Sequence, residues 1–356
     1  MKKILTTTIY SSSYFNFLHF KNSSISLRFL STKISSSSSN SLINWSKIKK
    51  ISGVVGTLTL IYSLNILPEF RQFKDPKHYY SNLGIRIQCS PLINFISPKA
   101  GILCNLTIPL FLREYIYGLY IYLYNCKMDE AKESSLLKYS TFSDFFNREL
   151  KEGIRPFDNN NFLVSPADGT VLHFGKIENG RVECVKGHDY DLNEFIGSDN
   201  NLNKIKEGND LYQLIIYLAP GDYHAFHSPT KWNIFEKIHF PGFYQSVRPS
   251  NLLKNPKLFC QNERIVLSGE WKFGYFSMTA IAAMFVGNIV IFNEEEKNRK
   301  LKEKTQLINK IIKNPGEKIG EFRMGSAIVL IFEAPKNISF CIEAGQKLKY
   351  GQKILL

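Results

Sequence analysis

Short β-rich runs separated by turn residues fill the second half of the chain, and this pattern constrains the fold more than any other feature. After Phe157 the runs are TVLHFGKI, RVECVKG, YQLIIYLAP, RIVLSGEW, NIVIF and SAIVLIF. Segments rich in β-branched and aromatic residues, bounded by Gly, Pro, Asn or Asp, are typical of strands. We therefore expect one mainly antiparallel β domain over residues 151–356.

A helical pattern precedes this region, from about Asp75 to Tyr139. Thr141, followed three positions later by Asp144, predicts that a short helix begins in TFSDFFNREL. The fold class we expect is therefore α+β, with a helical, membrane-facing part over residues 75–150 that leads into the β domain.

An apolar stretch from Ile108 to Tyr124 lies inside this helical part. Arg113 and Glu114 interrupt it. The interruption favours a helix that lies on the membrane or packs in the domain over a helix that spans the bilayer.

The net charge of +14 invites a nucleic-acid interpretation, but most of the excess is at the front. Residues 1–68 contain eight Lys or Arg and no acid, which leaves 37 basic against 31 acidic residues in the remainder. The stretch from Glu294 to Lys318 mixes both signs without interleaved aromatic residues. We expect it to be a solvated loop or exposed helix, and no nucleic acid as partner.

Residues 1–50 are free of acid and rich in serine, with an unbroken run from Ser35 to Ser39. This composition favours a mitochondrial or plastid transit peptide with a basic flank over a generic disordered tail. Residues 51–67 are an uncharged stretch of 17 residues, at the short limit of a membrane span, and predict a single anchor. Lys49 and Lys50 precede it, so for a mitochondrial inner-membrane protein we expect the bulk of the protein, including the β domain, in the intermembrane space.

Three small clusters could carry chemistry. In Ser165 to Gly169 an acid stands in a tight turn, which taken alone is a hairpin turn. Asp222 to His227 brings an acid near two histidines, but no third metal ligand is obvious. A general base oriented by a carboxylate is the more economical reading, and two hydrogen-bonded histidines of a β domain remain an alternative. Gly325 and Ser326 are not part of a G-x-S-x-G nucleophile elbow.

Taken together and in order, these clusters resemble the phosphatidylserine decarboxylase family, in particular its animal-type mitochondrial branch. The similar stretches run from about residue 140 to the C-terminus, and are FSDFFNREL, SPADG, VKGHDYDLNEFIG, IIYLAPGDYHAFHSPT, HFPG, LFCQNERIVLSGEW, MTAIAAMFVGNI and GEFRMGSAIVLIFEAP. Several such blocks in a fixed order are a specific signal.

The resemblance implies a role for each matching residue. Asp168, His227 and Ser326 would form the charge relay that drives self-cleavage between Gly325 and Ser326. His224 would transfer a proton near the substrate. The products would be a large (β) chain and a small (α) chain of 31 residues, Ser326 to Leu356, held together as a heterodimer.

The resemblance also implies the reaction. Ser326 would become a covalent pyruvoyl group, the only cofactor, with no metal. The pyruvoyl ketone would form a Schiff base with the serine amine of phosphatidylserine, and the products would be phosphatidylethanolamine and CO2. The partners implied are the substrate and membrane lipid, and a homodimer is left open.

One position departs from the family, whose members usually carry a hydroxyl residue after the reactive serine. Here that position is Ala327, which puts the rate of self-processing in question. Two rival hypotheses follow: a membrane-anchored scaffold of the same fold that no longer cleaves itself, and a lipid-directed serine hydrolase with the same trio. The hydrolase lacks a nucleophile elbow.

Overall fold

The computed structural model describes residues 97, 99, 101–155, 163–185, 188–197, 205–255, 257–284, 289–291, 304–322 and 325–356. The predicted transit peptide over residues 1–50 and the predicted anchor over residues 51–67 lie outside these residues. Within the described part, no helix combines the length and the apolar character needed to cross a membrane.

The helical part of the described chain includes a helical turn at residues 101–104, α4 (Leu110–Tyr124), the 3-10 helices η4 (Met128–Glu130) and η5 (Leu136–Lys138), and α5 (Phe142–Phe146). The predicted capping box is confirmed, because Thr141 Oγ1 accepts the Asp144 N–H and Asp144 Oδ2 accepts the Thr141 N–H, both at 3.0 Å. The two α-helices pack through Tyr117 of α4, whose ring stacks on Phe145 at 4.5 Å.

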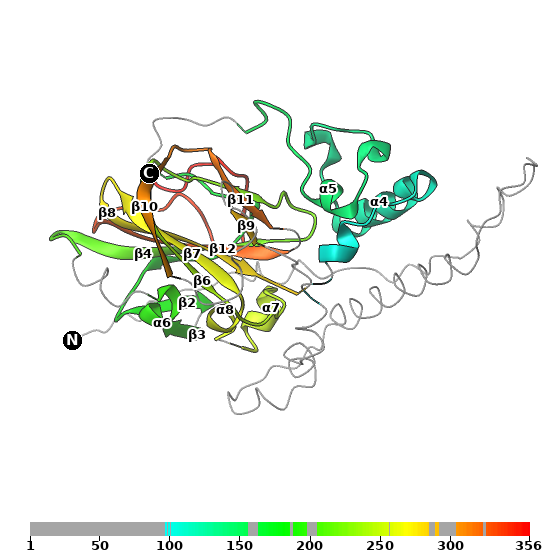
Figure 1. The fold of residues 1–356 in the computed structure, drawn as a ribbon. Helices are drawn as coiled ribbons and strands as arrows, with labels where there is room; N and C mark the ends of the chain where they lie inside the picture. Colours follow the sequence, from blue (N-terminus) through cyan, green and yellow to red (C-terminus); the bar gives the residue numbers. More distant parts are fainter. Residues whose placement is uncertain are drawn as a thin grey trace, which may run out of the picture. The chain divides into compact units, whose positions relative to one another are not determined.

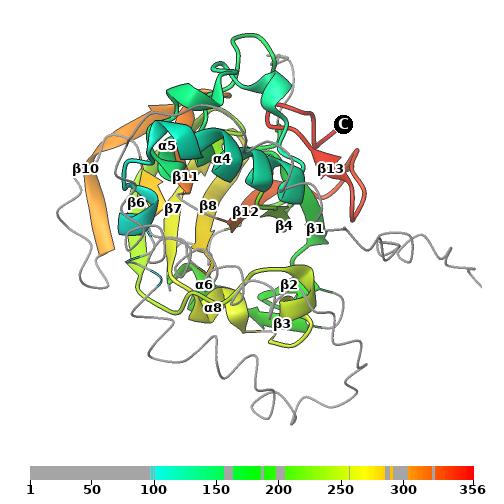
Figure 2. The ribbon, with the colours of Figure 1, turned by 90° about the vertical axis from the view of Figure 1, so that its right-hand side faces the viewer.

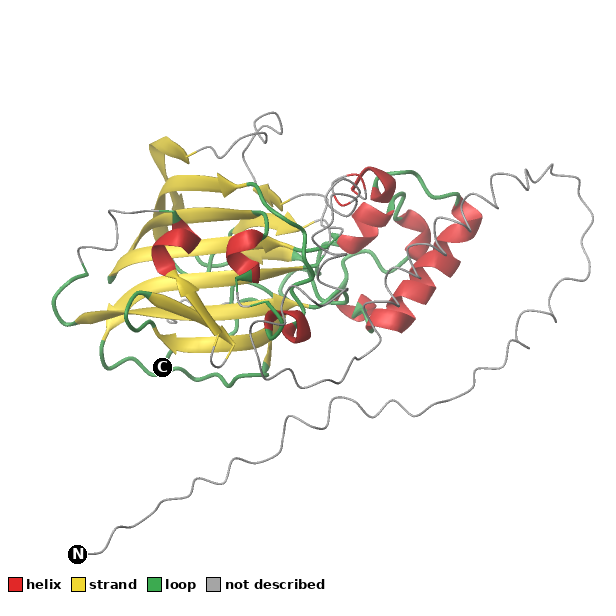
Figure 3. Ribbon diagram, turned by 90° about the horizontal axis from the view of Figure 1, so that it is seen from below, coloured by secondary structure: helices red, strands yellow, loops and turns green. Residues whose placement is uncertain are grey.

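The main body is an antiparallel sheet of eight strands in the order β10-β6-β7-β8-β12-β4-β1-β13 (Figure 2). Two smaller sheets have the order β5-β11-β9 and the pair β2-β3. Figure 1 shows the strands and the short helices between them, and Figure 3 shows the helical part gathered at one end of the strands. The expected antiparallel β domain is confirmed.

The remaining helices are α6 (Leu192–Ile196), α7 (Pro249–Leu252) and α8 (Leu258–Gln261). The strands are β1 (Gly169–Lys176), β2 (Arg181–Val185), β3 (His188–Asp191), β4 (Asn209–Leu218), β5 (Ala225–His227), β6 (Trp232–Phe240), β7 (Arg264–Trp271), β8 (Gly274–Ala282), β9 (Ile289–Ile291), β10 (Lys304–Lys313), β11 (Lys318–Phe322), β12 (Ser326–Pro335) and β13 (Lys347–Leu348).

Strand β12 lies at the centre of the main sheet. It pairs along its length with β4 on one side and with β8 along Ser326–Phe332 on the other. Every residue from Ser326 to Ala334 is buried, and such burial of apolar surface is the main favourable contribution to folding. The segment that begins at Ser326 is therefore held by two ladders and by the core.

Every predicted strand is present, as β1, β2, β4, β7, β9 and β12. The expectation of a loop or helix from Glu294 to Lys318 is wrong over β10, which pairs with β6. β10 is an edge strand, and edge strands carry charged residues because one side meets no other strand. Composition therefore resembled that of a solvated loop although the backbone is paired.

Candidate active site

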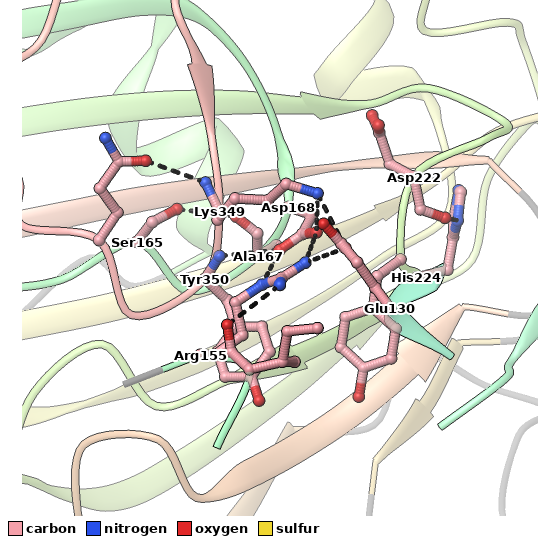
Figure 4. Close-up of polar contacts among 12 residues, drawn as sticks. Glu130, Arg155, Ser165, Ala167, Asp168, Asp222, His224, Lys349 and Tyr350 are labelled. Atoms are coloured by element: carbon pink, nitrogen blue, oxygen red, sulfur yellow. Dashed lines mark hydrogen bonds and ion pairs between the residues drawn. The ribbon is translucent and has the colours of Figure 1, made fainter. Parts of the chain in front are cut away.

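Asp168 lies immediately before β1 and is almost fully buried. Its Oδ1 accepts the backbone N–H of Tyr350 at 2.8 Å. Its Oδ2 accepts hydrogen bonds from Arg155 Nη2 at 2.7 Å and from Lys349 Nζ at 3.1 Å (Figure 4). The segment around it is not a hairpin turn, because Val164 forms a bridge with Lys353 near the C-terminus.

Glu130, the last residue of η4, completes this ion cluster. Its Oε2 lies 2.5 Å from Arg155 Nη2 and 3.1 Å from Lys349 Nζ. Burial lowers the pKa of Arg155, but the hydrogen bonds to Asp168 and Glu130 outweigh it, and the pKa is raised. Two carboxylates and two cations therefore balance, which a buried cluster requires.

His227, at the end of β5, has both ring nitrogens engaged. Nδ1 lies 2.8 Å from the carbonyl oxygen of Gly316, an acceptor, so Nδ1 carries the proton. Nε2 accepts from the Tyr223 hydroxyl at 3.2 Å. The ring stacks on Tyr350, with centroids 4.1 Å apart and an interplanar angle of 4°. Burial lowers the pKa of His227 to about 4, so its neutral form is favoured.

Asp168 and His227 both contact Tyr350, but no hydrogen bond joins Asp168 to His227. Tyr350 contacts Asp168 through its backbone and His227 through its ring. In the expected relay the carboxylate orients the imidazole, but the carbonyl of Gly316 occupies Nδ1 here. Asp168 acts on His227 through its charge, which raises the pKa of the imidazole against the larger effect of burial.

His224 faces a different environment. Its ring centroid lies 4.2 Å from that of Phe146, the last residue of α5. Nδ1 donates to the backbone carbonyl of Asp222 at 2.8 Å. Nε2 is buried and has no hydrogen-bond partner among the described residues. Burial lowers the pKa of His224 to about 3, so a free lone pair is held at Nε2.

Ser326 is the first residue of β12 and is fully buried. Its Oγ has no hydrogen-bond partner in the described part of the chain. Gly325 has open space where a side chain would lie. Ser326 pairs with Leu218, the last residue of β4, from which the chain continues to both histidines.

The end of β11 closes the same region. The N–H of Phe322, its last residue, donates to the carbonyl of His224 at 2.9 Å. Ser326 follows four positions later. β11 therefore links the segment of the two histidines to the start of β12, and among the described residues no direct hydrogen bond joins Ser326 to either histidine.

Arg148 is a buried cation at the junction of the helical part and the sheet. One guanidinium nitrogen donates to the carbonyl of Gly221 at 2.9 Å, and its Nε has no partner among the described residues. Within that part of the chain, Arg148 forms no ion pair with a carboxylate. Arg264, equally buried, donates from all three nitrogens to the carbonyls of Phe195, Cys260 and Glu194.

The junction is tightly packed. A Cβ at Gly221 would lie 2.0 Å from the carbonyl oxygen of Tyr124, the last residue of α4. The hydroxyl of Tyr120 donates to the carbonyl of Pro220 at 2.9 Å. Helix α4 is therefore fixed against the turn that carries Asp222 and His224.

Sequence reasoning missed five residues of this region: Glu130, Arg148, Arg155, Lys349 and Tyr350. Lys349 and Asp168 are 181 positions apart, and no local pattern connects them. Arg148 lies within the stretch FSDFFNREL, whose resemblance to the family was the one available signal.

Comparison with known proteins finds one family. The family model of phosphatidylserine decarboxylase matches residues 142–356. The mitochondrial phosphatidylserine decarboxylase proenzyme of Caenorhabditis elegans is 46% identical over 322 residues, covering 88% of this chain and 84% of its own. The corresponding Cricetulus griseus proenzyme is 39% identical, covering 78% and 75%. The mitochondrial proenzyme 1 of Saccharomyces cerevisiae is 30% identical, covering 74% and 72%. The chain therefore belongs to the phosphatidylserine decarboxylase family.

Proposed function

We propose that the chain decarboxylates phosphatidylserine to phosphatidylethanolamine by means of a pyruvoyl group that it makes from Ser326. The observation that carries the proposal is the state of Ser326, whose hydroxyl is buried and unbonded within the described residues, directly after a glycine with open space beside it. A buried hydroxyl without a partner is costly, so its retention at this position suits a chemical role.

Self-cleavage begins at the neutral imidazole of His227, with the Tyr223 hydroxyl giving up its place on Nε2. As Nε2 takes the proton of Ser326 Oγ, the oxygen attacks the carbonyl carbon of Gly325. The proton then passes to the amide nitrogen, the C–N bond breaks, and an ester joins the two residues. The charge of Asp168 stabilises the imidazolium that forms in between.

The second stage removes the Ser326 Cα proton. Gly325 leaves as a carboxylate with the ester oxygen, and Ser326 becomes dehydroalanine. Addition of water and release of ammonia then leave a pyruvoyl group at the front of the small chain. The position of Ser326 suits a pyruvoyl group, because β12 remains paired with β4 and β8 after cleavage and these strands hold its first residue in place.

In turnover, the pyruvoyl group supplies a ketone that reacts with the serine amine and accepts the electrons released with CO2. The free lone pair at His224 Nε2 takes up the proton that the serine ammonium group must lose before its nitrogen can attack, and Nε2 later delivers that proton to the carbon that has lost CO2. The two histidines have different neighbours: His227 lies against Tyr350, and His224 lies against Phe146 of the helical part. This separation supports one role for each.

Arg148 supports an anionic substrate. A buried guanidinium without a carboxylate partner is costly, and an anionic headgroup would neutralise it. The serine carboxylate is the group to be lost, and a cation paired with it would oppose its departure as CO2. We assign Arg148 to the phosphodiester of the lipid.

The exposed face of α4 supports delivery from a bilayer. Six large apolar or aromatic side chains of this helix are exposed: Leu110, Phe111, Tyr115, Leu119, Tyr122 and Leu123. An apolar helix face with aromatic residues is suited to the interface between lipid and water. The same helix ends against the turn of His224, so a lipid bound there starts close to the site.

We also propose the location and assembly. The relatives are named mitochondrial, and residues 1–67 have the composition of a transit peptide followed by an anchor. This supports a single-pass protein of the mitochondrial inner membrane, with the catalytic domain in the intermembrane space. The cleaved chains remain a heterodimer because β12 stays within the sheet.

The full chain, expressed in membranes and measured by intact mass under denaturing conditions, tests the proposal against a Ser326→Ala control. Two chains divided after Gly325 are expected, with the small chain about 17 Da lighter than its unmodified sequence because serine has become pyruvoyl. Release of CO2 from carboxyl-labelled phosphatidylserine vesicles should accompany the cut. A single uncleaved mass without activity would instead support the scaffold hypothesis. An uncleaved chain that reacts with a fluorophosphonate probe would support a hydrolase.

One double variant, measured on two substrates, tests the membrane contact. Phe111→Ser with Tyr115→Ser should lower kcat/KM on phosphatidylserine vesicles and leave activity on a short-chain, water-soluble phosphatidylserine unchanged. Equal loss on both substrates would argue against the α4 face as the contact.

A further inference from the structure

We propose that Tyr350, near the C-terminus of the small chain, is a positioning residue that supports the protonated imidazole of His227 during self-cleavage. The inference rests on the proposed function, because it concerns the step that makes the pyruvoyl group. It adds a residue from the far end of the chain to the relay of Asp168, His227 and Ser326.

The ring geometry carries the first part of the argument. The planes of Tyr350 and His227 differ by 4° and their centroids are 4.1 Å apart, so the imidazole lies flat on the phenol ring. The face of an aromatic ring attracts a cation within about 6 Å. When His227 takes the proton of Ser326, its new charge therefore lies on the face of Tyr350.

The groups around His227 leave this contact prominent. Gly316 offers a carbonyl to Nδ1 and Tyr223 a hydroxyl to Nε2. The Tyr223 ring lies farther from the imidazole than the Tyr350 ring, with its centroid 5.8 Å from that of His227 and the planes 30° apart. The charge of Lys318 on β11 disfavours the imidazolium and that of Asp168 favours it. Lys318 forms an ion pair with Glu321 at 2.9 Å, which reduces its net effect.

Arg155 is a second cationic group that contacts Tyr350. Its guanidinium carbon lies 5.7 Å from the centroid of the Tyr350 ring and its nitrogens bind Asp168. Tyr350 thus contacts both the fixed cation of the cluster and the imidazole whose charge changes. Its backbone N–H binds Asp168 at 2.8 Å, so the same residue holds the carboxylate that complements that charge.

The backbone of this segment is held independently of the Tyr350 side chain. Pairing of β13 with β1 matches Leu348 to Gly169. The N–H of Gly351 donates to the carbonyl of Ser165 at 2.9 Å, and the carbonyl of Gln352 accepts the N–H of Ser165 at 2.7 Å. A substitution at Tyr350 therefore removes the ring and keeps the hydrogen bond to Asp168.

The stacking of Tyr350 on His227 is not needed to hold the small chain to the large chain. The ladders of β12 already join the small chain to β4 and β8. Tyr212 of β4 provides a comparison, because its ring stacks on Phe332 of β12 at 6.0 Å, towards the opposite end of that strand. It is an aromatic contact between the two chains that lies away from His227.

The test uses the full chain made by cell-free translation with membranes, and follows the fraction cleaved against time in buffers between pH 3 and pH 8, a range that includes the pKa of His227 at about 4. Tyr350→Leu should cleave roughly threefold to tenfold more slowly, the size expected for a lost cation–π contact. The pH at which cleavage falls to half should also move down, because the imidazolium is less stable. Tyr350→Phe keeps the ring and should restore both. Tyr212→Leu should leave both near the wild-type values.

Three results would overturn the inference: Tyr350→Leu cleaving within twofold of wild type with the same pH profile, Tyr350→Phe as slow as Tyr350→Leu, or Tyr212→Leu equally slow. Proteolytic resistance of each variant, measured on a Ser326→Ala background, separates slow chemistry from misfolding. If the wild-type chain itself remains whole, the proposed function fails first, and this inference fails with it.

Discussion

Arg155 binds Asp168 at 2.7 Å inside the protein, where the side chains are only 5% and 3% exposed. Replacing Arg155 with Met leaves two carboxylates facing Lys349 alone. Loss of one partner of a buried ion pair costs about 3–5 kcal/mol. We expect the free energy of unfolding of Arg155→Met to fall by about that amount, measured by urea titration on an uncleaved Ser326→Ala background.

The control is an ion pair on the surface. Lys132 and Glu149 are 2.9 Å apart but 61% and 68% exposed. Such pairs contribute little because water screens them, so Lys132→Met should show no measurable loss. Equal effects of the two variants would mean that the cluster around Asp168 is not the stabilising element described here.

The sequence was sufficient to predict β4, which precedes the two histidines, and β12, which begins at Ser326. β4 and β12 are dense in β-branched and large apolar residues because both faces of each are buried, and such runs are recognisable without a structure. The strands that were not predicted are β3, β5, β6, β8, β10, β11 and β13. β10 is a strand because its backbone pairs with β6, and this pairing cannot be recognised from the amino-acid composition of β10.

The site was also predicted in part, with some residues found from local sequence and others only from the structure. Asp168, His224, His227 and Ser326 were found because they stand in blocks that resemble a family. Their immediate partners were not, because Gly316 acts through a backbone carbonyl and Tyr350 through a ring stack across the fold. Contacts of both kinds depend on the three-dimensional arrangement and have no local sequence pattern.

The separation of the two histidines gives the second prediction. His227→Gln should slow self-cleavage at least about a hundredfold, the usual contribution of a general base. His224→Gln should still cleave, and then turn over phosphatidylserine at least about a hundredfold more slowly per pyruvoyl group formed. Gel analysis of cleavage and CO2 release, normalised to the cleaved fraction, measure the two effects. The opposite pattern would exchange the proposed roles.

Arg148 supplies the third prediction. Arg148→Met should raise KM for phosphatidylserine vesicles about tenfold to a hundredfold, the range for a hydrogen bond to a charged group. Self-cleavage should continue, because Arg148 lies beside Gly221 and not among the groups that bind His227. Arg148→Lys keeps the charge and should recover part of the loss.

Arg264 offers a matched control for that experiment, since its three nitrogens are already satisfied by carbonyls. Arg264→Met should lower stability and leave KM unchanged in the fraction that folds. If Arg148→Met, like Arg264→Met, lowers stability and leaves KM unchanged, then Arg148 is a structural residue and the phosphodiester binds elsewhere.

The fourth prediction concerns Ala327. Successive residues of a strand point to opposite faces, so the side chain of Ala327 lies on the other face of β12 from that of Ser326. A hydroxyl there points away from the reactive one. Ala327→Ser should cleave within about threefold of wild type in a time course of the full chain. Acceleration beyond tenfold would show that the missing hydroxyl limits maturation.

The last prediction concerns acid stability. Burial lowers the pKa of His224 to about 3 and of His227 to about 4, whereas an unfolded histidine titrates near 6.5. Below pH 6.5 the unfolded chain therefore binds protons that the folded chain does not. The free energy of unfolding should fall by about 1.4 kcal/mol per pH unit for each histidine, down to about pH 4.

Urea titrations of the uncleaved Ser326→Ala chain between pH 7 and pH 5 would measure this slope, since the carboxylates with lowered pKa, such as Glu130, titrate below that range. His173, whose pKa burial also lowers, contributes to the slope in every variant. Adding His224→Gln should remove the contribution of that residue, and adding His227→Gln should remove a second contribution of similar size. If the slope were the same in all three proteins, the pKa of each histidine would be nearly the same in the folded and the unfolded chain, and this prediction would be wrong.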